Sequence, residues 1–479
     1  MKPSRAKLEA RRRANTELAL LVLALVICLA AYALVGLARQ PQLPAGMAGY
    51  GGVLAAIALG THLFMRRVTP GADPLLFPLA FVLNGLGLVM IRRIDYALAA
   101  GEASELAPTQ TIWTIIGVGL LIATLVAARD YEVLDRYRYS IGIAAIVLLL
   151  MPLLPFIGAK INGADLWIRI AGFSIQPGEF AKIGLAVFFA SYLAENRQLL
   201  TVATNRVGPL MVPPARAFGP VLAVWGLSLA VLVFERDLGL SLLLFGLFIS
   251  MLYVATSRPA YVIGGLGLFA IGGYVAYLLF GHVQDRISIW LDLWNSEALG
   301  AGQLQQSLFA LGTGGLAGVG LGQGHPDFIP IVSTDFIFSA FGEEAGLLGT
   351  TALLLCYLLF VGRGFRIALR CPHEFGQLLA QGLVTLYALQ VFIIVGGVTR
   401  LIPLTGLTLP FVSYGGSSLL ANYVLVALLI RVSTDEVGAR PAPLRRARAE
   451  SADTAAKPGS AAAQTRRATA EPGSAEAQK

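Results

Sequence analysis

Asp335 is the residue of this chain that is best placed to do chemistry. It ends a long polar segment and is followed by Phe336 and an apolar run of membrane length. An ionisable group at a membrane boundary is a candidate for function, because burying its charge is costly. The alternative is a carboxylate that complements the dipole at a helix N-terminus, which contributes up to about 1 kcal/mol. Position alone leaves both explanations open.

Glu179 and Lys182 form a second candidate. They follow Pro177, which suits the first turn of a helix, and they lie three residues apart on one helix face. This spacing predicts an ion pair, with Lys182 about one turn inside the membrane. A pair that only sets the depth of the helix is the simpler alternative, although a sequence without functional constraint would carry no charge there.

Two further groups of charges adjoin or interrupt apolar sequence. The segment 235–237 reads Glu-Arg-Asp between two apolar runs, where solvation at a turn is the simplest explanation and only Asp237 is ambiguous. Glu343 and Glu344 fall within an apolar segment and therefore require partners. We expect Lys182 or an arginine of an outer loop as the counter-ion.

Two glycine-containing segments also carry polar residues. Gln306 and Ser307 precede a glycine-rich stretch, 312–320, which permits tight turns and close approach of other backbone. It matches neither the dinucleotide-binding nor the Walker motif, so a cradle for another phosphate ligand and simple packing both explain it. Ser413 and Ser417 flank a Gly-Gly pair that can unwind a helix start or receive a neighbouring helix.

The composition excludes a soluble globular protein, because 56% of the residues are hydrophobic and only 13% are charged. Three cysteines and four scattered histidines provide neither a disulfide framework nor the spacing of a zinc site. The net charge of +8 reflects membrane topology, since no basic stripe interleaved with aromatic residues indicates nucleic-acid binding.

Apolar runs of about twenty residues predict the transmembrane helices. They lie at 17–38, 46–65, 73–91, 109–128, 139–157, 178–195, 216–234, 238–256, 260–281, 336–362, 375–398 and 413–432. We therefore predict an all-α polytopic membrane protein with about 12 transmembrane helices. The first run is a retained signal anchor, because it is too long for a signal peptide and lacks a cleavage site.

The distribution of Lys and Arg orients the chain with both termini in the cytoplasm. Residues 1–16 are then a basic cytoplasmic N-terminus, and residues 436–479 are a basic tail without apolar periodicity that we expect to be disordered. Polar segments 158–177, 282–335 and 399–412 lie on the outer face. Segment 282–335 keeps several large apolar residues, so we expect it to fold against that face.

These motifs together resemble the SEDS family (shape, elongation, division and sporulation), the RodA/FtsW/SpoVE group. The matching pieces, in the family's order, are Gln176-Pro177-Gly178-Glu179 with Lys182, Asp237-Leu238-Gly239, Gln306-Ser307 with Gly314-Gly315, Thr334-Asp335-Phe336-Ile337-Phe338 with Glu343-Glu344, and Leu409 to Ser417. The family core has ten helices and corresponds to residues 73–435, so 17–72 form two additional N-terminal helices. Leu166, Gly178 and Val319 replace the family's usual Arg, Ser and Lys.

The resemblance implies a peptidoglycan glycosyltransferase of the cytoplasmic membrane that polymerises lipid II at the outer face. It implies that Asp335 is the catalytic base. Because pyrophosphate departs with negative charge, we expect cationic groups to stabilise it, with Lys182 as the candidate cation and Glu179 orienting Lys182. Supporting contacts to substrate are implied for Trp167, Arg169, Gln306, Ser307, Glu343, Ser413 and Ser417. A class B penicillin-binding protein is the implied partner, and a divalent cation, Mg²⁺ or Mn²⁺, is a candidate cofactor, with none certain.

The N-terminal extension and basic tail resemble actinobacterial members and favour a RodA-like role in elongation over an FtsW-like role in division. A lipid II flippase is the main alternative, since twelve spans suit a transporter. However, transport sites lie near the bilayer midplane, whereas the polar residues here cluster at the outer boundary. A scaffold that only activates a partner enzyme is a third alternative, and it would tolerate a neutral Asp335.

Overall fold

The computed structural model describes residues 5–44, 46–98, 105–155, 157–161, 164–170, 173–201, 205–207, 210–212, 215–296, 298 and 300–435. The predicted tail, 436–479, lies outside the described residues. Most of the predicted basic N-terminus is described, and from Arg5 onwards it continues directly into the first helix.

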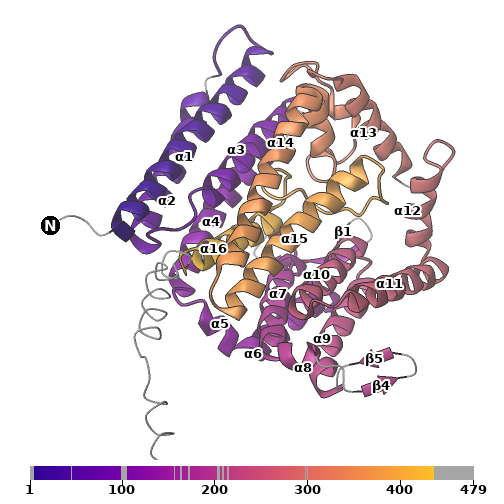
Figure 1. Cartoon of the computed structure of the whole chain (residues 1–479). Helices are drawn as coiled ribbons and strands as arrows, with labels where there is room; N and C mark the ends of the chain where they lie inside the picture. Colours follow the sequence, from indigo (N-terminus) through magenta and orange to yellow (C-terminus); the bar gives the residue numbers. More distant parts are fainter. Residues whose placement is uncertain are drawn as a thin grey trace, which may run out of the picture. The chain divides into compact units, whose positions relative to one another are not determined.

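Helices dominate the described residues (Figure 1). In chain order the elements are α1 (Arg5–Leu37), α2 (Met47–Val68), α3 (Leu76–Leu98), α4 (Leu106–Ala127), α5 (Glu132–Arg136), α6 (Arg138–Leu150), η1 (Met151–Leu153), β1 (Gly158–Ile161), β2 (Ala164–Ile170), β3 (Phe173–Ile175), α7 (Gly178–Glu195), α8 (Arg197–Thr201), β4 (Asn205–Val207), β5 (Leu210–Val212), α9 (Ala215–Phe234), α10 (Leu238–Thr256), α11 (Pro259–Leu279), α12 (Gly281–Leu291), α13 (Ala301–Gly314), η2 (Pro326–Phe328), α14 (Ile337–Arg370), α15 (Glu374–Val398) and α16 (Gly416–Ser433).

Among the described residues, nine helices are long and apolar enough to cross a membrane: α1, α2, α3, α4, α10, α11, α14, α15 and α16. The three other predicted runs are helical as well, as α6 with η1, α7 and α9. Helix α6 is short, the 20-residue α9 offers a shorter apolar stretch at Gly219–Val231, and α7 carries the charges of Glu179, Lys182 and Glu195. The prediction of an all-α membrane protein is correct except for two small antiparallel sheets, β1-β2-β3 and β4-β5.

The core is formed by helices that are apolar on every side. Helices α3, α15 and α16 are largely buried, whereas α11 is almost entirely exposed. A helix that is hydrophobic all round belongs either in a protein core or in lipid. The long apolar surface of α11, which includes Ile263 and Leu266, therefore suits the lipid phase (Figure 1).

Helix α14 is interrupted at Gly346, which adopts φ 65° and ψ −167°. The glycine-rich segment after α13 fills this break. Val319 N donates to Glu343 O at 2.9 Å before the break, and Leu347 N donates to Gly315 O at 2.9 Å after it. Only glycine fits here, because a Cβ on Gly318 would lie 2.2 Å from Glu344 O. The stretch 312–320 is therefore a packing element, and its N–H groups are used within the fold.

The two N-terminal helices are attached to the core through α3. Buried Glu17 of α1 and His62 of α2 share a hydrogen bond of 3.0 Å. Cys28 of α1 packs against Gly85, where a Cβ would lie 2.4 Å from its sulfur, so this glycine permits the close crossing of α1 and α3. Tyr50 of α2 also donates a hydrogen bond of 2.8 Å to Gly85 O.

Candidate active site

Asp335 lies two residues before the start of α14 and is partly buried. A Cβ added at Gly406 would lie 3.7 Å from both Asp335 Oδ2 and Arg286 Nη2, so the carboxylate and the guanidinium face the same point of the loop before α16. Arg286 comes from α12 and also donates a hydrogen bond to Leu404 O of this loop. The loop therefore holds the two charges near each other.

Burial raises the pKa of Asp335 to about 6, although a hydrogen bond with Thr334 and the charge of Arg286 act in the opposite direction. A general base is most effective when its pKa lies near the working pH. Asp335 is therefore mostly ionised at neutral pH and more basic than an ordinary aspartate.

The predicted ion pair on α7 is present and is almost completely buried. Lys182 Nζ lies 2.6 Å from Glu179 Oε2 and donates a second hydrogen bond of 2.8 Å to Gln390 Oε1 of α15. Gln390 in turn donates to Thr408 O at 2.8 Å. A chain of polar contacts thus joins α7, α15 and the loop that faces Asp335.

Asp237 lies between these two groups of charges. It caps α10 by accepting a hydrogen bond of 2.8 Å from Leu240 N. Burial, with a smaller contribution from Glu179, raises its pKa to about 6, although the hydrogen bond from Leu240 N and the charges of Arg286 and Lys182 act in the opposite direction. Asp237 therefore shares one region with Glu179, Arg286 and Lys182, and Arg286 also acts on Asp335. The region holds two cations and three carboxylates.

Ser413 and Ser417, which the sequence predicted as supporting residues, position the backbone of the charged cluster. Ser413 donates a hydrogen bond of 2.5 Å to Thr334 O, directly before Asp335, and accepts one of 2.9 Å from Leu409 N. Ser417 accepts a hydrogen bond of 2.9 Å from Gln176 N at the entry to α7. Both serines therefore orient the backbone that presents the charged side chains.

Three other predicted residues lie apart from the charged cluster. Ser307 of α13 shares a hydrogen bond of 2.6 Å with Ser339 of α14, and Gln306 is exposed. Glu343 accepts a hydrogen bond of 3.0 Å from His325 N. These contacts fix α13 and the glycine-rich segment to the upper part of α14.

We expected Lys182 or an arginine of an outer loop as the counter-ion of the α14 glutamates, and for Glu344 the partner is an arginine. Glu344 pairs at 2.7 Å with Arg93, which follows the predicted apolar run 73–91 and lies near the end of α3. Lys182 is the partner of Glu179. Spacing along the chain could not decide between the two alternatives, because it does not reveal which helices are neighbours.

Trp167 and Arg169 lie on β2 of the three-stranded sheet. Trp167 pairs with Ala159 and is half-buried, whereas Arg169 pairs with Ser174 and is exposed. Within the described residues, neither side chain forms a hydrogen bond or ion pair with a member of the Asp335 cluster. The sheet leads directly into α7 and so lies next to Glu179 in the chain.

Sequence reasoning missed Arg286 and Gln390 as members of the site. Gln390 had a usable signal, because a buried amide in an apolar helix needs a partner. Arg286 had one as well, since it is the only Lys or Arg in the polar segment 282–335.

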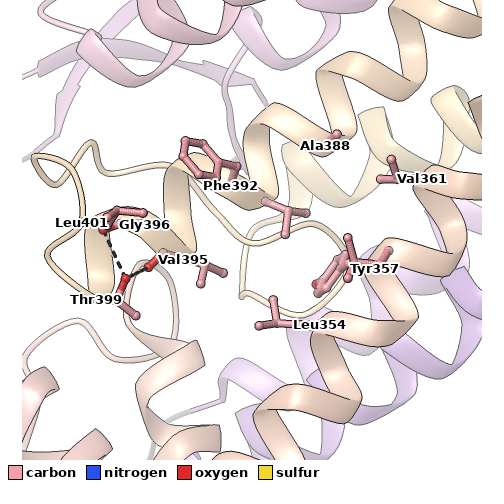
Figure 2. Close-up of a pocket in the computed structure, with 11 residues that line it drawn as sticks. Leu354, Tyr357, Val361, Ala388, Phe392, Val395, Gly396, Thr399 and Leu401 are labelled. Carbon is pink, nitrogen blue, oxygen red and sulfur yellow. Dashed lines mark hydrogen bonds between the residues drawn. The ribbon is translucent and has the colours of Figure 1, made fainter.

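A separate cavity of about 320 Å³ lies between α14 and α15 (Figure 2). Its lining is apolar apart from the hydroxyls of Tyr357 and Thr399, which donate to Pro410 O at 2.7 Å and to Val395 O at 2.8 Å. Phe392 borders this groove and is exposed. The groove has the chemistry of a hydrocarbon or helix contact and lacks the charges of the Asp335 cluster.

Comparison with known proteins gives a consistent result. The model of the FtsW/RodA/SpoVE family, described as cell cycle protein, matches residues 74–437. Peptidoglycan glycosyltransferase RodA of Mycobacterium tuberculosis is 48% identical over 451 residues, which cover 93% of this chain and 95% of that protein. The Mycobacterium leprae protein of the same name is 46% identical over 424 residues, covering 88% of this chain and 90% of that protein.

Two solved structures share the fold. A chain of a peptidoglycan synthase complex that coordinates polymerization and crosslinking superposes with a TM-score of 0.60 at 26% identity, covering 76% of this chain and 98% of that one. The rod shape determining protein RodA of Thermus thermophilus superposes with a TM-score of 0.54 at 25% identity, covering 76% of this chain and 97% of that one.

Proposed function

Since the chain belongs to the FtsW/RodA/SpoVE family of cell cycle proteins, it is a membrane-embedded peptidoglycan glycosyltransferase of the RodA type, and we propose that lipid II is its substrate and Asp335 its general base. The single observation that carries the catalytic assignment is the placement of Asp335 beside Arg286, at the start of a long apolar helix. The FtsW and SpoVE relatives are less similar, at about 35% identity, which favours the RodA-like role.

In the proposed reaction, the Asp335 carboxylate accepts the proton of the acceptor sugar hydroxyl. The hydroxyl oxygen forms a bond to the anomeric carbon of the donor, and the bond from that carbon to undecaprenyl pyrophosphate breaks. Arg286 and Lys182 supply positive charge for the departing pyrophosphate. Fixed charges aimed at a group that becomes more negative lower the barrier without reorganisation.

The position of the cluster fits a substrate with a lipid tail. Asp335 precedes the membrane-length helix α14, and Asp237 precedes another, α10. At this level Asp335 can reach the sugar of the substrate while the polyprenyl chain of the substrate remains in the hydrocarbon. We further propose that this end faces the outside and that both termini are cytoplasmic, because the Lys and Arg distribution then follows the positive-inside rule.

A flippase requires polar groups near the bilayer midplane. Here the charged side chains of the cluster lie at or within about one turn of helix ends, on α7 and before α10 and α14. This arrangement supports a boundary reaction in preference to transport. It also distinguishes an enzyme from a scaffold, since a scaffold has no use for a base with a raised pKa.

We propose that a divalent cation, Mg²⁺ or Mn²⁺, enters with the substrate. Among the described residues, no three His, Cys, Asp or Glu side chains come together as metal ligands. Magnesium is commonly bound by one or two carboxylates together with phosphate oxygens. Asp237 or Asp335 would hold it against the pyrophosphate. Chelation by EDTA is then expected to abolish polymerisation reversibly while leaving the melting temperature of the substrate-free protein unchanged.

We propose that the partner is a class B penicillin-binding transpeptidase and that the apolar groove of Figure 2 receives its membrane helix. Ala388 lies on the groove, so Ala388→Trp would fill part of it. This variant should lose the transpeptidase during co-purification. A matched Leu266→Trp change on exposed α11 should retain it. Equal retention by both variants would place the contact elsewhere.

The decisive experiment is glycan synthesis from purified lipid II with the wild type and Asp335→Asn, each supplied with the transpeptidase. We expect polymer from the wild type and a loss of about 10²–10⁴-fold in the variant, the usual contribution of general base catalysis. Equal polymer from both proteins would refute the role of Asp335. Lipid II crossing liposomes without any polymer would favour the flippase.

A further inference from the structure

A second cavity, of about 290 Å³ and lined partly by charged side chains, lies at the other end of the helices from Asp335. Its walls are the first turns of α1, the last turn of α2 and the turn at 69–72. The cavity borders Asp73, which pairs with Arg363 near the end of α14. Since Asp335 precedes the start of that helix, the cavity and the candidate active site are separated by most of the length of α14.

Three cations line this cavity: Lys7 and Arg11 of α1 and Arg66 of α2. All three are exposed, and in the part of the chain that the structure describes none of them has a hydrogen bond or ion pair to another side chain. The acidic group at the cavity, Glu17, is already paired with buried His62 at 3.0 Å. The cavity therefore presents an excess of positive charge that no described residue neutralises.

The cavity is held in shape by contacts of its own. Arg13 donates a hydrogen bond of 2.8 Å to Gly71 O, which ties α1 to the turn. The backbone N–H of Asp73 donates to Ser433 Oγ of α16 at 3.0 Å, and Arg363 Nε donates to Asp73 Oδ2 at 3.0 Å. Small-molecule sites are usually preformed in this way.

The faces that carry the cations continue as exposed apolar surface. On α1, Leu18 and Val22 follow Arg11 by 7 and 11 residues, which returns them to the same face of a 3.6-residue helix. On α2, Leu59 precedes Arg66 by 7 residues. All three leucine and valine side chains are exposed, so each face is charged at its end and apolar below.

We propose that this cavity binds the phosphate of an anionic phospholipid, whose acyl chains lie along the apolar faces of α1 and α2. The apolar part of α1, residues 18–37, spans about 30 Å, which matches the hydrocarbon thickness. Arg11 lies about 10 Å beyond it, at the level of the headgroups. Basic pockets between membrane helices bind anionic headgroups, with each cation near the surface contributing about 1 kcal/mol. The site belongs to the segment before residue 74 and is independent of the proposed polymerisation.

The test compares two double variants of the full-length protein. Arg11→Gln with Arg66→Gln removes two cavity cations, whereas Arg12→Gln with Arg67→Gln removes neighbouring cations that do not line the cavity. Both variants have the same net charge and change exposed residues of the same two helices. Native mass spectrometry measures retention of phosphatidylglycerol or phosphatidylcholine from mixed micelles, with thermal stability as the folding control.

We expect the wild type and the Arg12/Arg67 variant to retain phosphatidylglycerol equally well and in preference to phosphatidylcholine. The Arg11/Arg66 variant should retain it at least tenfold less, with an unchanged melting temperature. Equal losses in both variants, or no preference between the lipids, would overturn the proposal. Inorganic phosphate at millimolar concentration tests the source of the anion. Full displacement of the lipid would show a site for free phosphate instead, whereas persistence of the lipid supports the headgroup.

Discussion

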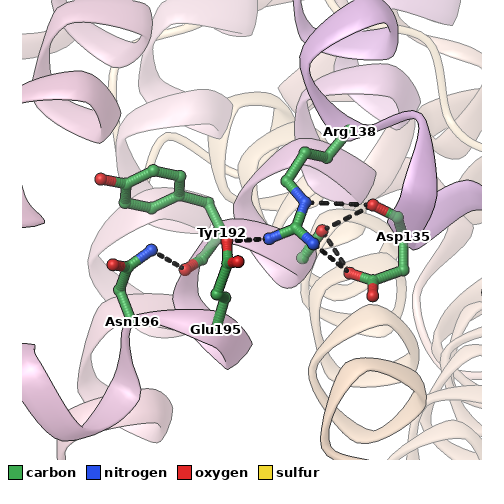
Figure 3. Close-up of polar contacts among 6 residues, drawn as sticks. Asp135, Arg138, Tyr192, Glu195 and Asn196 are labelled. Carbon is green, nitrogen blue, oxygen red and sulfur yellow. Dashed lines mark hydrogen bonds and ion pairs between the residues drawn. The ribbon is translucent and has the colours of Figure 1, made fainter.

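The two ends of α7 carry similar ion pairs in different surroundings. At its start, Lys182 and Glu179 have side chains that are only 1% and 4% exposed. At its end, Glu195 pairs with Arg138 of α6, and these side chains are 57% and 15% exposed (Figure 3). Asp135 adds a second acceptor to Arg138 there, at 3.6 Å, and the whole group remains near solvent.

This difference in burial separates a structural contact from a pair suited to chemistry. An exposed pair is screened by water and contributes about 0–1 kcal/mol. A buried pair gives up hydration, and removing one partner leaves an uncompensated charge that costs about 3–5 kcal/mol. Lys182 and Glu179 are therefore held as a desolvated ion pair, whereas Arg138 fastens α6 to α7.

The largest effect is expected from Lys182→Met. This change leaves Glu179 charged without its partner and should destabilise the protein by about 3–5 kcal/mol, measured by chemical denaturation in detergent. Lys182→Met combined with Glu179→Leu should recover most of that stability, because buried pairs are often replaceable by apolar residues. Polymerisation should remain low in the double variant. If the double variant recovered activity as well as stability, the pair of Lys182 and Glu179 would have only a structural role.

Arg286→Gln should lower the turnover of lipid II by about 10²-fold, the usual cost of losing one group that stabilises developing charge. Because Arg286 lowers the pKa of Asp335, its removal should also move the acidic limb of the pH–rate profile to higher pH. Turnover across pH 5–8 measures both effects. A reduced rate with an unshifted acidic limb of the pH–rate profile would show that Arg286 does not act on the pKa of Asp335.

A change of pH should alter the turnover of lipid II by the wild type less than the Arg286→Gln substitution does. The pKa of Asp335 is about 6, and a base acts in its deprotonated form. Turnover should therefore be nearly constant above pH 7 and fall about tenfold for each pH unit below 6. Asp237 has a similar pKa, so Asp237→Asn decides between the two groups. If this variant keeps the acidic limb, the limb belongs to Asp335.

The smallest effect is expected at the exposed end of α7. Glu195→Gln should change stability by less than about 1 kcal/mol and leave glycan synthesis within twofold of the wild type. The same denaturation and lipid II assays apply. A loss comparable to that of Lys182→Met would show that burial does not distinguish the two pairs.

Much of this arrangement was predictable from local sequence. Apolar run lengths predicted the helices, and the i,i+3 spacing predicted the pair of Glu179 and Lys182, because both depend on neighbours along one helix. Asp335 was identified by its position at a helix start. These inferences require no knowledge of how the helices are arranged.

Contacts between distant segments were not predictable in the same way. Arg286 reaches Asp335 through the loop at Leu404, and Gln390 reaches Lys182 from another helix. Arg93 meets Glu344 across more than two hundred residues. Each contact depends on which helices pack together. A buried helix that is apolar on every side has no sequence pattern that identifies its neighbours.

The break at Gly346 divides α14 into two pieces. The upper piece, which follows Asp335, is fixed by the glycine-rich segment because Glu343 O and Glu344 O accept hydrogen bonds from Val319 N and Gly320 N, and the first residues of the lower piece bond to the same segment. Adding one residue to a continuous helix rotates everything beyond it by about 100°. An insertion below Gly346 would instead turn only the membrane-spanning piece. The orientation of Asp335 is thus insulated from length changes in the part of the helix that must match the membrane.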